Sequence, residues 1–377
     1  TGKIRKAVKG DMVDFARLGD ALDNFSIANA CVQPSDVPED LIHVVWLEVL
    51  FTNTRKPFCC WYAREPQVAR DTIAVASAAQ GGVENIAKMK TIALTTCPDG
   101  ALSWGKSLIG LAECCKVGIP VEIMPMPVAG LTHPVTLAGL LAQTNAELLA
   151  AAVLAQIISP GAPLIYAPYP GILDMREGKT SFGTPEVALI SAAFSQLAKF
   201  YRFPSNTVTG TSDSKLPDPQ AAYDKMMTIL FPALARPDSM SLVGGMLDFA
   251  LIGSLEQLVI DDEICGAVRR ILEGVSVDDE SLALDVIRKV GHGGVFLRNM
   301  HTVKHYRKEL WMPNVTDRSD RTKWTNEGCK DMRQRAKERV KEILSREFHS
   351  PLPEDKEKAM KRAIEEIKKR EKREGIS

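Results

Sequence analysis

The sequence lacks the short motifs that mark the commonest nucleophile, metal and nucleotide sites. It has no GxSxG turn, no HExxH helix, no Walker loop and no GxGxxG segment after an apolar run. It also shows no paired-carboxylate signature of a glycosidase. The familiar signatures of those enzyme classes are therefore missing, and polar and aromatic residues at strand ends are left as the candidates for chemistry.

Excess charge and a recognisable targeting segment are missing too. The 377 residues include 47 basic and 47 acidic side chains, so the formal net charge is 0, which argues against nucleic acid or an anionic membrane surface as the main partner. We find no apolar run of the roughly 20 residues that span a bilayer. The first residues, Thr1 to Lys6, lack the apolar core of a signal peptide, and we expect a cytoplasmic protein.

No CxxC pair occurs among the eight cysteines. A disulfide framework is not expected in so large a chain without secretory signals, which agrees with a reducing compartment. Zinc would need Cys and His from separate strand ends, such as Cys97 and His133. Buried structural cysteines are the favoured interpretation, and we predict no bound metal.

What the sequence does contain is a repeated alternation of short apolar runs and helical patterns. With 45% hydrophobic and 25% charged residues, the composition is that of a soluble globular protein. Successive runs lie roughly 30 to 45 residues apart, the length of a strand, a helix and two loops. The runs predict strands at 25–32, 57–62, 91–96, 120–126, 163–167, 206–210 and 239–243, and the clearest helices are predicted at 68–79, 103–116, 136–158, 185–200 and 219–233.

These units predict an α/β fold, and specifically a (β/α)8 TIM barrel with additional C-terminal helices. Runs that are apolar throughout indicate strands covered on both faces, and seven units approach the eight of a barrel of roughly 250 residues. Two segments are candidates for the eighth strand, Gly294 to Leu297 and Lys3 to Val13. A doubly wound open sheet is the rival architecture.

We predict that the barrel covers residues 1–300 and that residues 301–377 form a helical extension. From Lys330 onward the helical pattern is dense in charges of alternating sign, with few apolar positions. Such a pattern indicates a solvated helix packed along one narrow stripe, or alternatively a docking surface for a partner protein.

Aromatic residues gather where the expected strands end, and a barrel builds its active site at those ends. The predicted binding set is Trp61, Tyr62, Tyr166, Tyr169 and Phe182. An aromatic cage of this kind attracts a quaternary ammonium, with each ring face contributing about 0.5–2 kcal/mol. Plain packing is the alternative role for each ring.

Four polar residues at strand ends complete the predicted substrate site: Asp99, His133, Asp213 and Asp248. His133 is held extended by the following proline and is either a ligand contact or a loop histidine with its own partners. Asp213 could face a cationic group or cap the next helix. Asp248 follows paired glycines that allow close backbone approach to a ligand. The sequence assigns no catalytic side chain.

Beyond these patterns, an ordered series of segments resembles the trimethylamine methyltransferase superfamily over nearly the whole chain. The segments are Pro125–Gly130, Pro134–Gly139, Asn145–Glu147, Phe182–Glu186, Thr211–Lys215, Leu258–Glu263, Val277–Glu280 and His301–Tyr306. The resemblance implies a (β/α)8 barrel that demethylates a methylated amine. The implied methyl acceptor is Co(I) of a corrinoid (cobalamin) on a separate small protein.

No pyrrolysine is written in the chain, so the resemblance points to the non-pyrrolysine branch, similar to glycine betaine methyltransferase. Around the seventh strand, Leu242, Val243, Gly244 and Met246 stand where a polar or aromatic residue is expected, and the donor can therefore differ from glycine betaine. Carnitine, proline betaine and trimethylamine are alternative donors. Two further functions stay open: a non-catalytic quaternary-amine-binding barrel and a metal-dependent methyltransferase. We also expect a homo-oligomer.

The implied reaction agrees with the missing catalytic motifs. A quaternary nitrogen has no lone pair to protonate, so the amine already leaves as a neutral group. The protein needs only to hold the cation, exclude water and present one methyl group in line with the acceptor. An apolar aromatic pocket with a few hydrogen-bonding groups is sufficient for that task.

Overall fold

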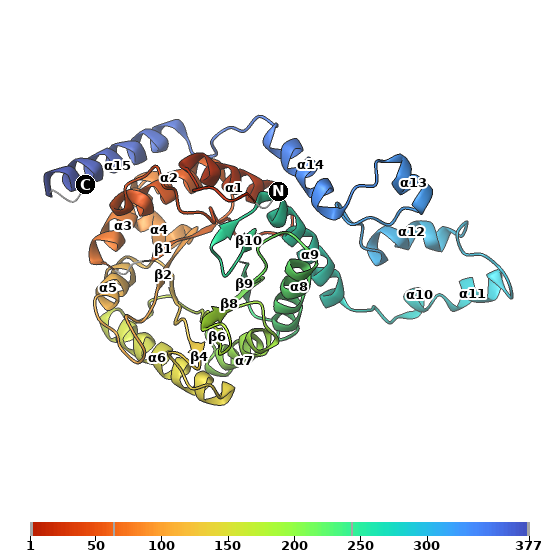
Figure 1. Cartoon of the computed structure of the whole chain (residues 1–377), viewed down its shortest axis with the longest axis horizontal. Helices are drawn as coiled ribbons and strands as arrows, with labels where there is room; N and C mark the ends of the chain where they lie inside the picture. The colour runs from red at the N-terminus through yellow and green to blue at the C-terminus, as the bar shows by residue number, and fades with distance from the viewer. Residues whose placement is uncertain (1–2, 63–64, 243, 375–377) are drawn as a thin grey trace.

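The computed structural model describes residues 3–62, 65–242 and 244–374, without the side chains of residues 60–62, 242 and 374. Parallel strands lie at the centre, and helices surround them in a ring (Figure 1). One sheet has the order β1 (Phe58–Tyr62), β2 (Ile92–Thr96), β3 (Val121–Ile123), β5 (Leu164–Tyr166). A second parallel pair joins β8 (Asn206–Thr209) and β9 (Ser239–Leu242). The α/β prediction is confirmed at this level.

The predicted strands and the observed ones agree at six of seven positions, from 57–62 to 239–243. The exception is the run 25–32, for which one parallel bridge, Ala28 with Phe58, is found among the described residues. Two residues inside the run explain the difference. Asn29 Oδ1 accepts from the Cys31 N–H, and Cys31 has a φ of 41°. The chain therefore turns here and does not continue as a paired strand.

Neither candidate for the eighth strand is a strand. Residues 9–13 begin α1 (Lys9–Ala21), and residues 294–297 lie in an exposed loop. Gly291 and Gly293 have φ of 68°, a conformation that favours turns over extended pairing. Among the described residues, the sheets β1-β2-β3-β5 and β8-β9 are linked by a single bridge between Tyr166 and Ser205.

The helices of the ring lie before, between and after the strands in chain order. They are α1, α2 (Ile42–Asn53), α3 (Pro66–Gln80), α4 (Val83–Met89), α5 (Ser107–Val117), α6 (Leu137–Ile158), α7 (Pro185–Tyr201), α8 (Pro219–Leu234) and α9 (Leu255–Glu273), with a short 3-10 turn at Glu39–Leu41. Caps fix several starts. The Thr184 side chain accepts from the Val187 N–H with Pro185 at the first helical position, as the sequence predicts.

Short strands extend the carboxyl ends of the central ones. β4 (Val128–Ala129), β6 (Gly171–Asp174) and β7 (Lys179–Ser181) form a three-stranded sheet. β10 (Met246–Leu247) and β11 (Ile252–Gly253) form a hairpin after β9. We call these segments, together with the loops that follow β2, β3, β5 and β8, the mouth.

Helix α6 is the one described helix long and apolar enough to cross a membrane by length and composition, with a mean hydropathy of 1.5 over 18 residues. The segment is not a continuous apolar run, because Gln143, Asn145 and Glu147 interrupt it, but its mean hydropathy stays high. A core helix of a soluble protein passes the same test. Here α6 packs on α5, α7, β3 and β4.

The C-terminal part divides into two kinds of helix. α14 (Met332–Leu344) packs on α1 and α9, and α15 (Glu354–Glu374) packs on α2 and α3. Between the ring and α14, the helices α10 (Asp279–Leu282), α11 (Leu284–Val290) and α12 (Met300–Glu309) project sideways, as does α13 (Arg321–Asn326) (Figure 1). The last ring helix, α9, ends at Glu273, and the boundary at residue 300 stays a prediction.

Candidate functional site

A stacked aromatic pair is the centre of the mouth. The rings of Tyr169 and Phe182 lie 5.0 Å apart at an interplanar angle of 27°. They pack with Met124, Ala167 and Val208, which stand at or near the carboxyl ends of β3, β5 and β8. Because the carboxyl ends of parallel strands meet at one edge, residues far apart in the chain converge here.

Asp213 ties this pair to the loop after β8. Its Oδ1 accepts from the Phe182 N–H at 3.0 Å, and its Oδ2 accepts from the Ser181 hydroxyl. The Thr211 hydroxyl donates to the Phe182 carbonyl at 2.7 Å. The helix cap that the sequence left open for Asp213 belongs instead to Asp218, whose Oδ1 accepts from the Ala221 N–H.

A second carboxylate, Asp224 of α8, lies beside Asp213. Its Oδ2 accepts from the Ser212 hydroxyl at 2.9 Å and from the Asp213 N–H at 3.3 Å. Burial raises the pKa of Asp224 more than these hydrogen bonds lower it. A Cβ at Gly183 would lie 2.7 Å from Asp224 Oδ2, which is too close for a side chain. Glycine at this position therefore allows the backbone after Phe182 to lie against this carboxylate.

His133 and Glu147 form a buried pair on the other side of the mouth. They line a cavity of about 420 Å³ together with Cys97, Met126 and Thr132. His133 Nε2 lies 3.4 Å from Glu147 Oε1 without an aligned hydrogen bond, and Nδ1 lies 3.0 Å from the Thr132 hydroxyl. Burial alone would raise the pKa of Glu147, but contacts with His133 and the Leu102 N–H lower it below its ordinary value.

The remaining predicted residues are scattered. Asp99 Oδ2 accepts from the Gly105 N–H at 2.6 Å and the Ser107 hydroxyl at 2.5 Å, which holds the start of α5. Asp248 lies 3.5 Å from Lys215 at the outer edge of the β10–β11 hairpin. Trp61 and Tyr62 end β1, but their side chains are outside the described residues.

Tyr166 lies away from the mouth, which corrects the sequence expectation. Its hydroxyl donates to Asn145 Oδ1 of α6 at 3.2 Å, and its ring packs near Phe194 of α7. Only 1% of this residue is exposed. Side chains alternate along a strand, so while Ile165 faces the mouth cluster, Tyr166 faces the helices. We therefore leave Tyr166 out of the candidate site.

Besides Glu147 and Asp224, two more buried ionisable residues were missed by the sequence reasoning. The first is Glu122 in the middle of β3. Its Oε1 accepts from Asn206 Nδ2 at 2.6 Å and from Cys59 Sγ at 3.3 Å, and Oε2 accepts from the Thr95 hydroxyl at 3.1 Å. Burial raises the pKa of Glu122 despite these donors. A glutamate inside an otherwise apolar run was the signal that could have revealed it.

The second is Lys225, which pairs with Asp261 at 2.8 Å with both side chains at most 1% exposed. Lys225 also donates to the Gly210 carbonyl at 2.8 Å, and Asp261 accepts from the Gly245 N–H at 2.7 Å. The pair thus joins α8 and α9 to the loops after β8 and β9. No sequence pattern distinguishes Lys225 from the exposed lysines of other helices.

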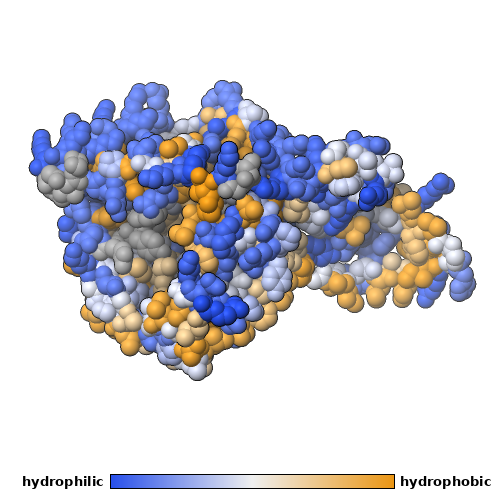
Figure 2. Space-filling model, in the orientation of Figure 1, coloured by the Kyte–Doolittle hydropathy of each residue, from blue (hydrophilic) through white to orange (hydrophobic). Residues whose placement is uncertain are grey.

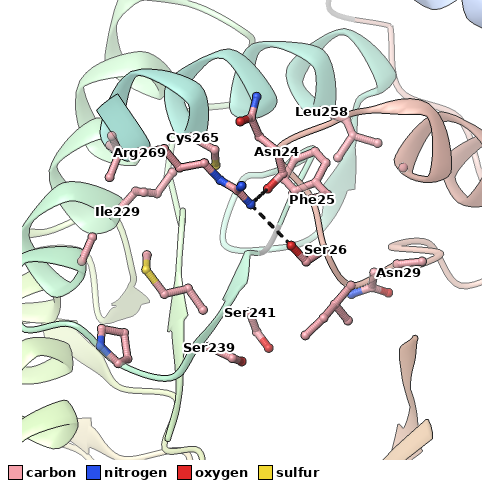
Figure 3. Close-up of a pocket in the computed structure, with 18 of the residues that line it drawn as sticks. Asn24, Phe25, Ser26, Asn29, Ile229, Ser239, Ser241, Leu258, Cys265 and Arg269 are labelled. Carbon is pink, nitrogen blue, oxygen red and sulfur yellow. Dashed lines mark hydrogen bonds between the residues drawn. The ribbon is translucent and has the colours of Figure 1, made fainter. Parts of the chain in front are cut away.

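A further cavity of about 330 Å³ lies between the segment 24–31, β9, α8 and α9. Figure 3 shows Arg269 of α9 reaching toward Asn24 and Ser26, and its Nη2 donates to the Asn24 carbonyl at 2.9 Å. This is the place where the run 25–32 fails to continue the sheet to β9. The cavity is therefore a gap in strand pairing, separate from the stacked aromatic pair.

Among the described side chains, no group of three His, Cys, Asp or Glu residues is arranged to hold a metal ion. Cys97, His133 and Glu147 line one cavity, but among the described residues they are not arranged as a metal-binding group. What the mouth offers is two aromatic faces, backbone carbonyls and carboxylates. Such an arrangement suits an organic cation.

Comparison with known proteins agrees with the resemblance found in the sequence. Residues 1–375 match the model of the trimethylamine methyltransferase (MTTB) family. Glycine betaine methyltransferase of Desulfitobacterium hafniense strain Y51 is 34% identical over 348 residues, which cover 91% of this chain and 72% of that protein. Trimethylamine methyltransferase MttB of another strain of that species is 32% identical, with 97% and 73% covered.

An archaeal relative, trimethylamine methyltransferase MttB1 of Methanosarcina mazei, is 33% identical over 96% of this chain and 73% of its own length. Among solved structures, the carboxyl transferase domain of Rhizobium etli pyruvate carboxylase has a TM-score of 0.38 at 11% identity, with 72% of this chain and 46% of that chain covered, a likeness too weak to inform the fold. The sequence relatives are sufficient: this chain belongs to the trimethylamine methyltransferase family.

Proposed function

We propose that this chain transfers a methyl group from a quaternary amine of the glycine betaine kind to a corrinoid carried by a separate protein. The observation that carries the proposal is the stacked Tyr169–Phe182 pair at the carboxyl ends of parallel strands, backed by Asp213 and Asp224. Membership of a methyltransferase family supports the reaction type. We further propose that the ring encloses a closed (β/α)8 barrel, with a seam at the run 25–32.

The mouth would bind the donor as a cation. Because the two rings stack on each other, a quaternary ammonium would lie against the outer face of one of them and would gain about 0.5–2 kcal/mol there. Asp213 and Asp224 add negative potential behind the rings, and they keep their places because Ser181 and Ser212 donate to them. Tyr169 is only 9% exposed, so its ring is itself largely removed from water.

The transfer itself needs no proton from the protein. The carbon–nitrogen bond breaks, its electron pair stays on nitrogen, and a neutral tertiary amine leaves. A reduced corrinoid, when bound, supplies the nucleophile that accepts the methyl group. The chain's own residues then have three tasks: to bind the ammonium, to orient one methyl group outward, and to exclude water.

The rim of the mouth supports docking of a partner that brings the acceptor. Each of several loops around the mouth exposes one or two large apolar side chains: Leu102 at 65%, Leu131 at 62%, Val135 at 68%, Met175 at 76% and Leu251 at 79%. Exposed apolar groups that gather on one rim are typical of a protein–protein contact. A corrinoid protein docked there would face Tyr169 and Phe182.

The test is methyl transfer to free Co(I) cobalamin, which is measured as the loss of the Co(I) absorbance. Glycine betaine, carnitine, proline betaine and trimethylamine are compared side by side, and we expect at least one quaternary donor to react. Calorimetric binding of a quaternary amine without any transfer, to cobalamin or to a corrinoid protein, would identify a non-catalytic binder. Loss of activity with a chelator would indicate a metal-dependent enzyme and contradict the proposal.

A further inference from the structure

A buried ring nitrogen faces the cavity beside the mouth and has no hydrogen-bond partner among the described residues. It is Nε2 of His133, whose side chain is only 3% exposed. Nδ1 lies 3.0 Å from the Thr132 hydroxyl, and the same hydroxyl oxygen accepts from the Val128 N–H at 3.0 Å. Because the Glu147 carboxylate lies 3.4 Å from Nε2, the hydrogen of a neutral imidazole belongs on Nε2, and the Thr132 hydroxyl donates to Nδ1. The cavity is therefore lined by an N–H donor that is still available.

The acceptor beside this donor is held in place by other groups. Glu147 Oε1 accepts from the Leu102 N–H at 2.8 Å and from Gln143 Nε2 at 3.3 Å. The Glu147 carbonyl accepts from the Trp104 indole N–H at 3.0 Å, and the Glu147 side chain is only 2% exposed. These contacts keep the carboxylate from turning to meet His133. A donor and an acceptor thus stand 3.4 Å apart at the cavity wall, and a third group can bind to both.

Glu147 has an unusual position on its helix, because it is the only charged residue of α6 and it is buried. None of the nine exposed residues of α6 is charged. Figure 2 shows hydrophobic residues along the lower edge of the molecule, where α6 lies in Figure 1. A helix that only packs on a core normally has the reverse arrangement, with its charges outside. Burying a carboxylate costs free energy, so its place at a cavity indicates a binding role.

The cavity adjoins the stacked rings of the mouth. Two backbone hydrogen bonds hold the chain after β3 extended along the chain after β5: Tyr169 N–H to the Pro125 carbonyl at 2.9 Å, and Gly171 N–H to the Pro127 carbonyl at 2.8 Å. Met124 packs with the ring cluster, and Met126 lines the cavity. Alternate residues of an extended segment face the same side and lie about 6–7 Å apart. A ligand with its ammonium group against a ring can therefore extend a short chain into the cavity.

The group that fits between His133 and Glu147 must both accept and donate a hydrogen bond. A hydroxyl oxygen can lie roughly 2.8 Å from both atoms, accept from Nε2–H and donate to the carboxylate.

A carboxylate does not fit there, because it has no hydrogen to donate. Although burial alone would raise the pKa of Glu147, contacts with His133 and Leu102 keep it below its ordinary value, so the ionised Glu147 would repel a second carboxylate. No lysine or arginine is among the described residues that line the cavity, and a substrate carboxylate would have no cation there.

We propose that His133 and Glu147 select a quaternary amine that carries a hydroxyl group on a short carbon chain. The ammonium group would lie against the stacked rings of Tyr169 and Phe182, and the hydroxyl between His133 and Glu147. The inference rests on the proposed function and narrows its donor, because a donor with a carboxylate in place of the hydroxyl gains nothing from these two side chains. His133 and Glu147 are then specificity-determining residues.

The test is calorimetric binding of matched trimethylammonium compounds without cobalamin. Each pair of compounds has a chain of two, three or four carbon atoms that ends in either a hydroxyl or a methyl group, as in choline beside propyltrimethylammonium. In at least one pair we expect the hydroxyl compound to bind at least about tenfold more tightly, because the methyl compound leaves a buried donor and a charged acceptor unpaired. Equal binding within every pair overturns the proposal and assigns the gap to water. If no compound binds at all, the proposed function fails with it.

Two variants test the residues themselves. His133→Phe removes the N–H and keeps a ring, and it should reduce the preference for the hydroxyl compound to less than about twofold. Glu147→Gln still accepts from the Leu102 N–H and should reduce the preference by a smaller factor. His349→Phe is the matched control, since His349 has an 82% exposed side chain, and it should leave the preference unchanged.

Binding of the methyl compound separates recognition from a structural role. Unchanged binding of this compound to His133→Phe shows that the pocket is still folded and supports the proposal. An equal loss of binding for the methyl and hydroxyl compounds would make His133 a structural residue only and would contradict it.

Discussion

Three buried charged groups between the strands and helices, Glu122, Lys225 and Asp261, are more completely paired than His133 at the mouth. Both oxygens of Glu122 accept hydrogen bonds, and Lys225 and Asp261 each have several partners. At the mouth, His133 Nε2 faces a cavity without an aligned hydrogen bond, and two aromatic rings stack beside carboxylates. Fully paired groups stabilise the fold, whereas incompletely paired groups beside a cavity are available to a ligand.

The largest expected effect lies in the fully paired region. Lys225→Met leaves Asp261 as a buried carboxylate without its cation, and we expect the free energy of unfolding to fall by about 3–5 kcal/mol. Urea unfolding measures it. Lys337→Met, at an exposed position in the middle of α14, is the control and should change stability by less than about 0.5 kcal/mol. Equal effects would mean that the buried pair contributes no more than a surface lysine.

A second paired group ties the C-terminal helix to the ring. Arg370 of α15 donates to both oxygens of Asp71 at 2.8 Å, and His43 lies 3.1 Å from Asp71. Burial alone would raise the pKa of Asp71, but donation from Arg370, His43 and Gln67 lowers it to about 2. The stabilisation is therefore present above the ordinary carboxyl range and is lost as the pH falls toward 2.

Arg370→Ala should lower the free energy of unfolding by about 2 kcal/mol at neutral pH. The acid-induced loss of stability should then be smaller, because the folded-state pKa of Asp71 would lie closer to its ordinary value and protonation of Asp71 would remove less stability. Unfolding by urea between about pH 2 and 7 tests both expectations. An equal loss of stability at low pH in the wild type and the variant would show that α15 contributes no electrostatic stabilisation through this contact.

At the mouth we expect a change of activity, beside the loss of stability that truncation of a buried ring brings. Tyr169→Ala removes one ring face from the stacked pair, and the proposed methyl transfer should lose about 3- to 30-fold in kcat/KM. Tyr169→Phe keeps the ring and should keep most of the activity. Tyr166→Phe, outside the mouth, is the control and should leave kcat/KM unchanged. Similar losses from both tyrosines would move the site away from the stacked pair.

The smallest effect is expected at Glu122, where the carboxyl is already stabilised in its neutral form. Because burial raises its pKa in the folded state, wild-type stability should decline as the pH rises from the ordinary glutamate value toward the raised one. Glu122→Gln has no such proton and should show a flat profile, with a difference of about 1 kcal/mol. A parallel decline in both proteins would assign the pH dependence to another group.

Local pattern predicted the elements well because each element is specified by neighbours in sequence. Apolar runs between Gly, Pro and Asp located β1, β2, β3, β5, β8 and β9, and Thr184 with Pro185 located the start of α7. The segment 25–32 failed because its apolar content outweighed the turn chemistry of Asn29 and Cys31. The strands of the mouth are so short that no alternation of apolar and polar residues can be recognised in them.

The candidate site was predictable only in part. Tyr169, Phe182 and Asp213 were named from the sequence and lie together, because each follows a parallel strand or its extension. Tyr166 was assigned to the same group, but the alternation of a three-residue strand turns it to the helices. Asp224 and Glu147 lie on helices, where a carboxylate looks like any solvent-facing residue until the packing is known.

Order and composition were therefore enough to assign the family and the succession of strands and helices, since both depend on residues close together in the chain. Which charges are buried, which of them have partners, and which helix faces stay bare was decided only by folding. Glu122 meets partners 27 to 84 positions away, and Lys225 meets partners 15 to 36 positions away. Contacts of that separation depend on register and packing, which no local pattern contains.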